Sequence, residues 1–467
     1  MNSRPAAAAA DARLFSRLLR LALPSLAEQT LTLLVTWIDM MLTTRYLRDD
    51  SFLAAMNQVN YLLWLIPSLF AFVGIGATAV IARHIGANDT LGAQRVVHQA
   101  LLVGAAIALV ILLLFPLLGA HFFELLQLPP QTAELGWTFL RTVLPAVPFV
   151  MIEQIGNACL RGAGDTVTGL VAMTLVNLVD AVVGVSLLTG WGPFPKLGWQ
   201  GIAIGTASGY AVGGILIGLA LWRGRGGLKL QRRLWRPDFS AIRRILRIGV
   251  PGGIDIIALI SCQLWFVSII NRLGDETAAA HGIAIRIEAL AYLPGTALQI
   301  AATTLAGQYL GARDPHNARR SALVSLLWAL LFMTGLGCAF YFAAAPLVRW
   351  FVGPEQDALV AAASPLIKTV AFGMPALALI QVFVGTLRGS GDTRIPLFVT
   401  FFGFLLVRIP LAYLLATPQG EPVLFGLATG WGIGVQGAWC AMVTDLWIRA
   451  LPLTLRFFQG GWQKIRV

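Results

Sequence analysis

The sequence predicts an all-α integral membrane protein: twelve transmembrane helices, arranged as two parallel six-helix repeats (lobes) around a central cleft. Hydrophobic residues make up 57% of the 467 residues and charged residues only 12%, and the mean hydropathy is +0.76. These values are typical of membrane proteins and not of soluble domains. Apolar runs long enough to cross a bilayer recur along the chain. Motifs of the first half return in the second half, which indicates a duplicated unit.

Each expected span is an apolar run of roughly twenty residues, the length that an α-helix needs to cross the hydrocarbon core. The runs do not alternate as barrel strands would. The first run continues past signal-peptide length and lacks a convincing cleavage site, so we expect it to be retained. The span cores lie near 24–44, 58–81, 97–119, 138–158, 168–190, 201–222, 249–270, 282–306, 321–342, 366–386, 396–416 and 433–455.

Basic residues gather in every second connection between these spans. The connection from Arg223 to Arg247 is the most basic, whereas the intervening connections carry acids such as Asp275 and Glu421. The positive-inside rule then places both termini and the basic connections in the cytoplasm, and we expect a multi-pass protein of the cell inner membrane. Because this placement accounts for the net charge of +12, the lipid bilayer is an expected partner and nucleic acid is not.

One phrase occurs twice: LRGAGDT at 160–166 and LRGSGDT at 387–393, with an offset of 388 − 161 = 227 residues. Glu28 corresponds to Asp255 at the same offset. Since six spans is an even number, both copies enter the membrane from the same side, as parallel repeats. We predict lobes at 1–222 and 248–467, joined by a cytoplasmic linker at 223–247, with a substrate site near the midplane of the cleft.

The repeated phrase favours a structural role. Each copy holds an arginine that stays on the cytoplasmic side, glycines that permit a tight turn, and an acid where the N-cap of the next span is expected. A gating hinge or a salt-bridge latch is the functional alternative. The residues concerned are Arg161, Gly164 and Asp165 in the first copy, and Arg388, Gly391 and Asp392 in the second.

These motifs resemble those of the multidrug and toxic compound extrusion (MATE) transporters. The resemblance rests on the two LRGxGDT phrases, on GAND at 86–89 and GARD at 311–314, on WIDM at 37–40 followed by FLAA at 52–55, and on the eighth span, AAHGIAIRIEALAYLPGTALQIAATTLAGQYLGA. It covers nearly the whole chain. It implies two lobes of six helices that export small organic molecules, often cationic, in exchange for protons or sodium ions. We expect the protein to act as a monomer.

Asp39 is the first candidate for the exchange chemistry, because an acid in a span needs a use or a partner. Its counterpart in the second half is Phe266, so the acid is not architecture shared by both lobes. The resemblance assigns the matching acid to the ion or proton site. A polar group near the outer interface is the alternative.

Asn177 and Asp180 in the fifth span are three residues apart and therefore share a helix face, so they could line the first lobe together with Asp39. A branch of the family called DinF-like commonly separates this amide and acid by four residues. One residue turns a side chain by about 100° around a helix. The chain thus departs from the proton relay proposed for that branch.

The second half offers weaker candidates. Asp255 lies one turn into a span after a proline, where a structural role at the helix start competes with ion binding. Glu288 is a candidate second cation site, with polar packing as its alternative, and Arg286 lies on a different face of the same helix. Arg408 could pair with an acid across the cleft.

Other function classes lack their motifs. The GIGVQG run at 432–437 matches GxGxxG, but no strand precedes it. A Walker A lysine, a metal-ligand spacing and a catalytic triad are absent from the sequence, so we expect no enzyme, no metal and no cofactor beyond a coupling proton or sodium ion. A lipid-linked oligosaccharide flippase of the same superfamily is the main alternative, and it would favour a cationic cleft. An integral-membrane transferase would need an acidic motif such as DDxxD.

Overall fold

The computed structural model describes residues 3–47, 49–125, 129–353, 356–423 and 426–465. These residues are helical almost throughout. Their strands are a short antiparallel pair, β1 (Pro422–Val423) and β2 (Ala428–Thr429). Both chain ends, for which the sequence predicts a cytoplasmic position, lie outside the described residues.

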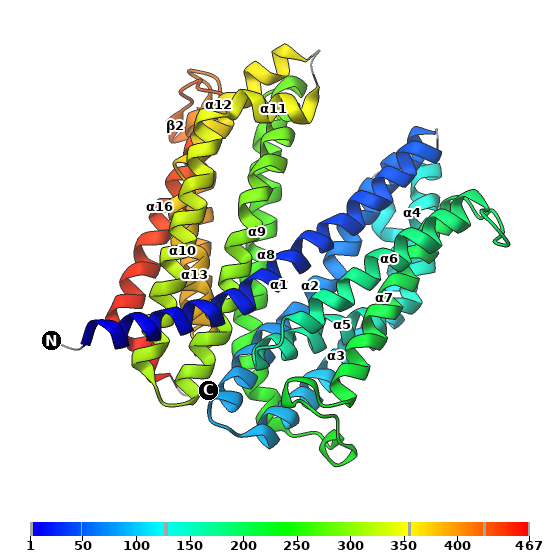
Figure 1. Ribbon diagram of the computed structural model, residues 1–467. Coiled ribbons are helices and arrows are strands. Elements are labelled where there is room, and N and C mark those ends of the chain that lie inside the picture. Colours follow the sequence, from blue (N-terminus) through cyan, green and yellow to red (C-terminus); the bar gives the residue numbers. More distant parts are fainter. Residues whose placement is uncertain (1–2, 48, 126–128, 354–355, 424–425, 466–467) are drawn as a thin grey trace. The chain divides into compact units, whose positions relative to one another are not determined.

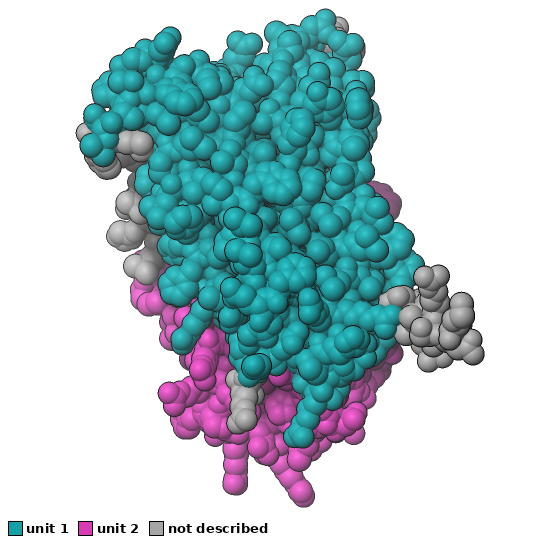
Figure 2. Space-filling model, turned by 90° about the vertical axis from the view of Figure 1, so that its left-hand side faces the viewer, with its two compact units in different colours: residues 1–22, 254–467 teal, residues 23–253 magenta. Residues whose placement is uncertain are grey.

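The chain forms two compact units. Unit 1 comprises Met1–Ala22 and Ile254–Val467, and unit 2 comprises Leu23–Gly253 (Figure 2). The division passes through two long helices, α1 (Ser3–Tyr46) and α8 (Phe239–Asn271), and not through the basic connection between them. The lobe and linker boundaries at 222 and 248 stay a prediction.

Unit 2 contains most of α1, the helices α2 to α7 and the first part of α8 (Figure 1). Within it, α6 and α7 lie side by side, and α5 packs against α2 and α7. Two short 3-10 turns, η2 (Arg225–Gly227) and η3 (Arg232–Trp235), follow α7. The helices after α1 are α2 (Asp50–Gly86), α3 (Thr90–Leu125), α4 (Pro130–Val143), which continues through η1 (Leu144–Ala146) into α5 (Val147–Ala163), α6 (Val167–Thr189) and α7 (Trp199–Trp222).

Unit 1 contains most of α8 and the remaining helices. Here α9, α10 and α13 pack together, and α16 packs on α13 and α15 (Figure 1). A 52° bend separates α12 from α13. The helices are α9 (Asp275–Gly311), α10 (Pro315–Phe342), α11 (Ala344–Val352), α12 (Asp357–Ala371), α13 (Met374–Ser390), α14 (Arg394–Phe402), α15 (Ile409–Ala416) and α16 (Val435–Gln459). The π-helical turn η4 (Gly403–Arg408) joins α14 to α15, and η6 (Gly461–Lys464) ends the described chain.

Among the described residues, ten helical stretches are long and apolar enough to cross a membrane, and the bent α12–α13 pair makes an eleventh. The twelfth predicted span, at 433–455, is the helix α16, whose apolar character is lowered by the buried Asp445 and Arg449. The architecture is therefore that of an all-α, multi-pass membrane protein with two repeats of six helices.

Small residues decide where helices meet within each unit, as is usual in membrane bundles. In unit 2, a Cβ on Gly162 would lie 2.7 Å from the carbonyl oxygen of Thr78, and the Thr78 hydroxyl donates to the Ala158 carbonyl over 2.8 Å. In unit 1, a Cβ on Gly389 would collide with the Thr303 carbonyl, and the Thr303 hydroxyl donates to Gly385 over 2.9 Å. The two halves thus use the same helix contact.

The GAND and GARD loops also share one geometry. Asn88 and Arg313 occupy the same place in the two loops, and each has φ = 58°. The following acid caps the next helix: Asp89 accepts the N–H of Gly92 over 2.8 Å, and Asp314 accepts that of Asn317 over 3.0 Å. These backbone hydrogen bonds lower the pKa of both carboxyls from its ordinary value. The loops are therefore capped turns.

Candidate functional site

Asp39 lies on α1 with its side chain inside unit 2, where the residue is only 1% exposed. The hydroxyl of Thr206 on α7 donates to its Oδ2 atom over 3.1 Å. Its Oδ1 atom is buried and has no hydrogen-bond partner among the described residues. Asp39 is therefore not a lipid-facing group, and half of its carboxylate is free to accept a proton or a cation.

Asn177 and Asp180 lie on α6 and are buried as well, at 7% and 1% exposure. The Asn177 amide donates to the carbonyls of Leu31 on α1 and Met173 on α6, over 3.0 and 2.9 Å. This leaves its Oδ1 atom, and both carboxylate oxygens of Asp180, without hydrogen-bond partners in the described chain. The amide nitrogen thus ties α6 to α1, while the oxygens stay available.

Glycines on α7 bring α6 close enough to complete this arrangement. Gly205 and Gly209 are one turn apart, as are Gly209 and Gly213. A Cβ on Gly205 would lie 2.8 Å from the carbonyl oxygen of Asp180, and one on Gly209 would lie 2.8 Å from that of Val176. The stripe of small residues lets the two backbones touch, and it places Thr206 in the same interior as the two acids.

We call Asp39, Asn177, Asp180 and Thr206 the Asp39–Asp180 site. The two carboxylates interact electrostatically across it. Its unpartnered atoms are all oxygens, which suit a proton or a hard cation. Within the described residues, no group of three or more His, Cys, Asp or Glu side chains could hold a metal ion. These oxygens thus have the chemistry to accept a proton or a small hard cation.

A second polar cluster lies in unit 2. Glu28 on α1 accepts hydrogen bonds from Asn157 over 2.7 Å and from Arg161 over 3.0 Å, both on α5. Glu153, one turn before Asn157, is 3% exposed and accepts from Gln154 over 2.8 Å. The arginine of the LRGAGDT phrase thus reaches inward to a buried acid.

The same pair is repeated in unit 1. Arg388 on α13 contacts Asp255 on α8 over 2.6 Å, and the residues in each pair are 133 positions apart. Asp255, a predicted ion-site residue, is therefore paired with an arginine, although its Oδ1 atom remains unpartnered among the described residues. Since the pair occurs in both halves, it accounts for the acids that the repeat preserves.

Unit 1 also contains a buried cluster of two arginines and one acid. Arg408 and Arg449 both contact Asp445, each over 2.9 Å, and the ring of Phe404 lies against both guanidinium groups at 4.5 and 4.6 Å. Arg408 thus pairs with an acid of its own unit, so the expectation of a partner across the cleft is wrong. The side chain of Glu288 on α9 forms no hydrogen bond or ion pair with any described residue, and it interacts electrostatically with Arg408.

The remaining loop residues act as caps and ties. Gly164 and Gly391 end α5 and α13 with φ of 91° and 89°, a conformation that favours glycine. Asp165 accepts the N–H of Thr168 over 3.1 Å, as an N-cap does, and contacts Arg225 over 2.9 Å. Asp392 is instead held by Arg456, over 2.8 and 2.9 Å.

Three features of these sites were not predicted from sequence. Thr206 lies within a glycine stripe that could have identified it, because small residues one turn apart mark a close helix contact. Asp445 and Arg449 are i, i+4 charges inside an apolar run, a visible signal of a buried pair. The inward pairing of Arg161 had no signal beyond the repeat itself.

The chain matches proteins already known. The MatE family model matches residues 24–185 and 251–414. A probable multidrug resistance protein NorM from Thermotoga maritima is 26% identical over 449 residues, which cover 96% of this chain and 93% of that protein. Multidrug resistance protein PmpM from Pseudomonas aeruginosa is 26% identical over 464 residues, which cover 96% of this chain and 92% of that protein.

Solved structures share the fold. A MATE protein crystallised in complex with MaL6 has a TM-score of 0.85 at 20% identity, over 95% of this chain and 96% of that one. A MOP superfamily transporter from Pyrococcus furiosus, described by the reverse polarity of its binding pocket, has a TM-score of 0.84 at 20% identity, over 96% of each chain. Because the family model matches both halves and most of the chain, the protein belongs to the MATE family and is a membrane transporter, not an enzyme.

Proposed function

We propose that the protein is an antiporter that exports organic compounds, cationic or amphipathic, in exchange for protons or sodium ions, by alternating access of its two lobes. The observation that carries this proposal is the set of unpartnered buried oxygens of the Asp39–Asp180 site. The names of NorM and PmpM, both multidrug resistance proteins, support the export of such compounds. We place the protein in the cell inner membrane, as a monomer with both termini cytoplasmic.

Exchange follows from the charge of the site. Two carboxylates buried among the spans raise the free energy of the protein when no counter-charge is near. The site therefore favours states in which a cation or a proton is bound. A coupling ion that enters from outside binds to the carboxylate oxygens of Asp39 and Asp180, and its positive charge thereby favours release of a cationic substrate. Loss of that ion to the inside restores the negative charge and favours substrate binding.

The energy available is adequate for export. Moving one elementary charge through a membrane potential supplies about 2.3 kcal/mol per 100 mV, and this corresponds to a concentration ratio of roughly fiftyfold. One proton or sodium ion per cycle can therefore drive substantial accumulation of the substrate outside.

Asp255 and Glu288 are the proposed participants in the second lobe. Asp255 keeps one free oxygen while Arg388 holds the other. Glu288 has no direct partner in the described chain and lies within the electrostatic reach of Arg408. The flippase alternative would require cations free to bind a pyrophosphate. Arg408 and Arg449 are both engaged by Asp445, so they give that alternative no support.

The proposal is tested in proteoliposomes loaded with a fluorescent cationic dye. Dye efflux is measured under an imposed proton gradient, under a sodium gradient and without a gradient. We expect one gradient to drive efflux and Asp39→Asn to reduce that driven component by about tenfold or more, because removing the charge removes the ion competition.

The matched control is Asp49→Asn, which makes the same chemical change in the connection before α2. Asp49 caps α2 by accepting the N–H of Ser51 over 2.9 Å, and asparagine caps equally well. This variant should retain driven efflux. Unchanged coupling in folded Asp39→Asn protein would refute the site, and no driven efflux of any dye in the wild type would refute the export of cations.

A further inference from the structure

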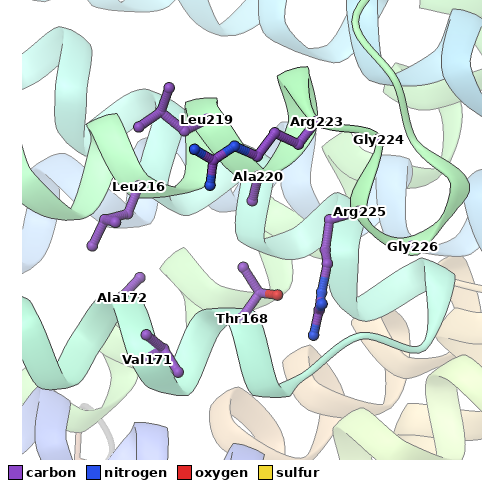
Figure 3. Close-up of a pocket in the computed structure, with 10 residues that line it drawn as sticks. All are labelled: Thr168, Val171, Ala172, Leu216, Leu219, Ala220, Arg223, Gly224, Arg225 and Gly226. Carbon is purple, nitrogen blue, oxygen red and sulfur yellow. The ribbon is translucent and has the colours of Figure 1, made fainter.

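Unit 2 has a pocket that the proposed transport cycle does not use. Its volume is about 550 Å³, and it lies between the first turns of α6 and the last turns of α7, next to the η2 turn (Figure 3). The Asp39–Asp180 site lies further along α6, and none of its four residues lines the pocket.

One end of the pocket is cationic. Arg223 and Arg225 line it together with the backbone of Gly224 and Gly226. The Arg225 side chain extends from the loop towards the start of α6 (Figure 3), where its Nε atom donates to Asp165 over 2.9 Å. Its terminal nitrogens have no further partner in the described chain, and the Arg223 side chain forms no hydrogen bond or ion pair with any described residue. One acid and two arginines leave a net positive charge.

The other walls are apolar and belong to two spans. Val171 and Ala172 of α6 and Leu216, Leu219 and Ala220 of α7 line the pocket, and both helices are apolar enough to cross the membrane. Val171 is 50% exposed, and Trp222, at the same end of α7, is 65% exposed. Side chains of this kind on the outside of a span face lipid, and tryptophan at a span end marks the level of the headgroups.

We propose that this pocket binds one anionic phospholipid. The phosphate lies between Arg223 and Arg225, and an acyl chain lies along the apolar walls of α6 and α7. Basic pockets between spans bind lipid headgroups in this way. The combination of basic and apolar walls favours a lipid over a free phosphate ion, because a free phosphate ion would contact the two arginines and leave the apolar walls without a ligand.

The corresponding acid of the second half is held differently. Arg225 is 60% exposed at its contact with Asp165, whereas Arg456, which holds Asp392, is 28% exposed and binds the acid through two nitrogens. A guanidinium that is largely exposed and held by one nitrogen can also bind a phosphate. We therefore assign the lipid site to the first repeat.

The test is native mass spectrometry of the full-length protein, titrated with phosphatidylglycerol and, separately, with phosphatidylcholine. We expect a single phosphatidylglycerol site with at least about tenfold preference over phosphatidylcholine, since each basic residue near an anionic lipid contributes about fivefold. The variant Arg223→Gln/Arg225→Gln should lose that preference. Val171→Trp, which fills the apolar part and changes no charge, should also lose the bound lipid.

The matched control is Arg232→Gln/Arg233→Gln, which removes two exposed charges of the η3 turn outside the pocket; it should keep the preference within about twofold. The single variant Arg223→Gln controls for misfolding, because the Arg223 side chain has no hydrogen-bond or ion-pair partner in the described chain that the substitution could remove. A loss of about fivefold in the preference of this variant supports the proposal. Equal binding of the two lipids, full retention by the double pocket variant, or displacement of phosphatidylglycerol by millimolar inorganic phosphate would each overturn it.

Discussion

Asp255 and Arg388 bring opposite charges together at 2.6 Å, with only 7% and 17% of their side chains exposed. In such a place, the loss of one partner leaves the other charge without water or counter-charge. The pair therefore affects stability less through the attraction between its members than through the free-energy cost of leaving one of them buried alone. Glu28 and Arg161 repeat the arrangement at 3.0 Å.

The first prediction concerns this pair. Arg388→Gln should lower the free energy of unfolding by about 3 kcal/mol, because it leaves Asp255 buried and unpaired. The double variant Arg388→Gln/Asp255→Asn should recover more than half of that loss. The measurement is unfolding by a denaturing detergent, followed by tryptophan fluorescence, with both single variants and the double variant in one thermodynamic cycle. Strictly additive losses would show that the two residues do not act as a pair.

At the residue scale, the sequence was informative wherever a residue type is restricted by its surroundings. Asp39 is recognisable in the sequence as a candidate site residue, because an acid within an apolar run is unfavourable unless it has a partner or a function. Gly164 is recognisable as a turn residue, because a left-handed backbone conformation favours glycine. The partner of Arg161 was not detectable, since the helical period gives the face that a side chain occupies but not the helix that faces it. The duplicated acid at 28 and 255 was the sole hint.

At the scale of elements, α7 determines the geometry of the Asp39–Asp180 site. Lipid provides no hydrophobic drive between helices, so close backbone approach is a main source of helix association. The glycines of α7 permit that approach to α6 and so fix the depth of Asp180 relative to Thr206. A change in the contact would move a carboxylate without altering any residue of the site.

The second prediction tests this contact. Gly209→Ala adds a methyl group that would lie 2.8 Å from the Val176 carbonyl and 3.2 Å from the Asp180 Cβ atom, so α6 must move. We expect gradient-driven efflux to fall severalfold and stability to drop by about 1–3 kcal/mol. The control is Gly218→Ala on the same helix, whose added Cβ would meet Ile152 at an ordinary 3.7 Å. Equal effects of the two substitutions would mean that the stripe does not position the site.

The π-helical turn at Gly403–Arg408 is a second example at this scale. A Cβ on Gly403 would collide with Asp445 and with the Arg449 side chain, so the turn and α16 fit together only with glycine there. Such turns are often found at functional sites. The sequence predicted one continuous span at 396–416, because hydropathy does not register a single wide turn.

At the scale of the whole molecule, most of the architecture followed from hydropathy and the internal repeat. The bilayer requires long apolar helices, so the spans were visible, and the 227-residue offset grouped them into two sets of six. The assignment of residues 1–22 to the second half's unit was not foreseeable, because the packing of α1 depends on tertiary contacts of Leu18 and Leu21 that no local pattern encodes.

The third prediction concerns orientation. In a variant without the four native cysteines, Lys229→Cys should react with a membrane-impermeant maleimide only after the cells are permeabilised, because the basic connection belongs in the cytoplasm. Lys196→Cys, in the connection between α6 and α7, should react in intact cells. Both positions are exposed. The reverse labelling pattern would show that the topology is the opposite of the predicted one, and the proposed direction of transport would then be wrong as well.

The position of the first helix has a consequence for how the chain is made. Arg17 donates to the hydroxyl of Tyr309, which lies 292 residues later, and Phe15 stacks on Trp328. At a synthesis rate of about 5–20 residues per second, roughly 15–60 s pass between the emergence of Arg17 and that of Tyr309 from the ribosome. This segment is thus synthesised long before its final neighbours, and it can complete its packing in unit 1 only after the second half has been made.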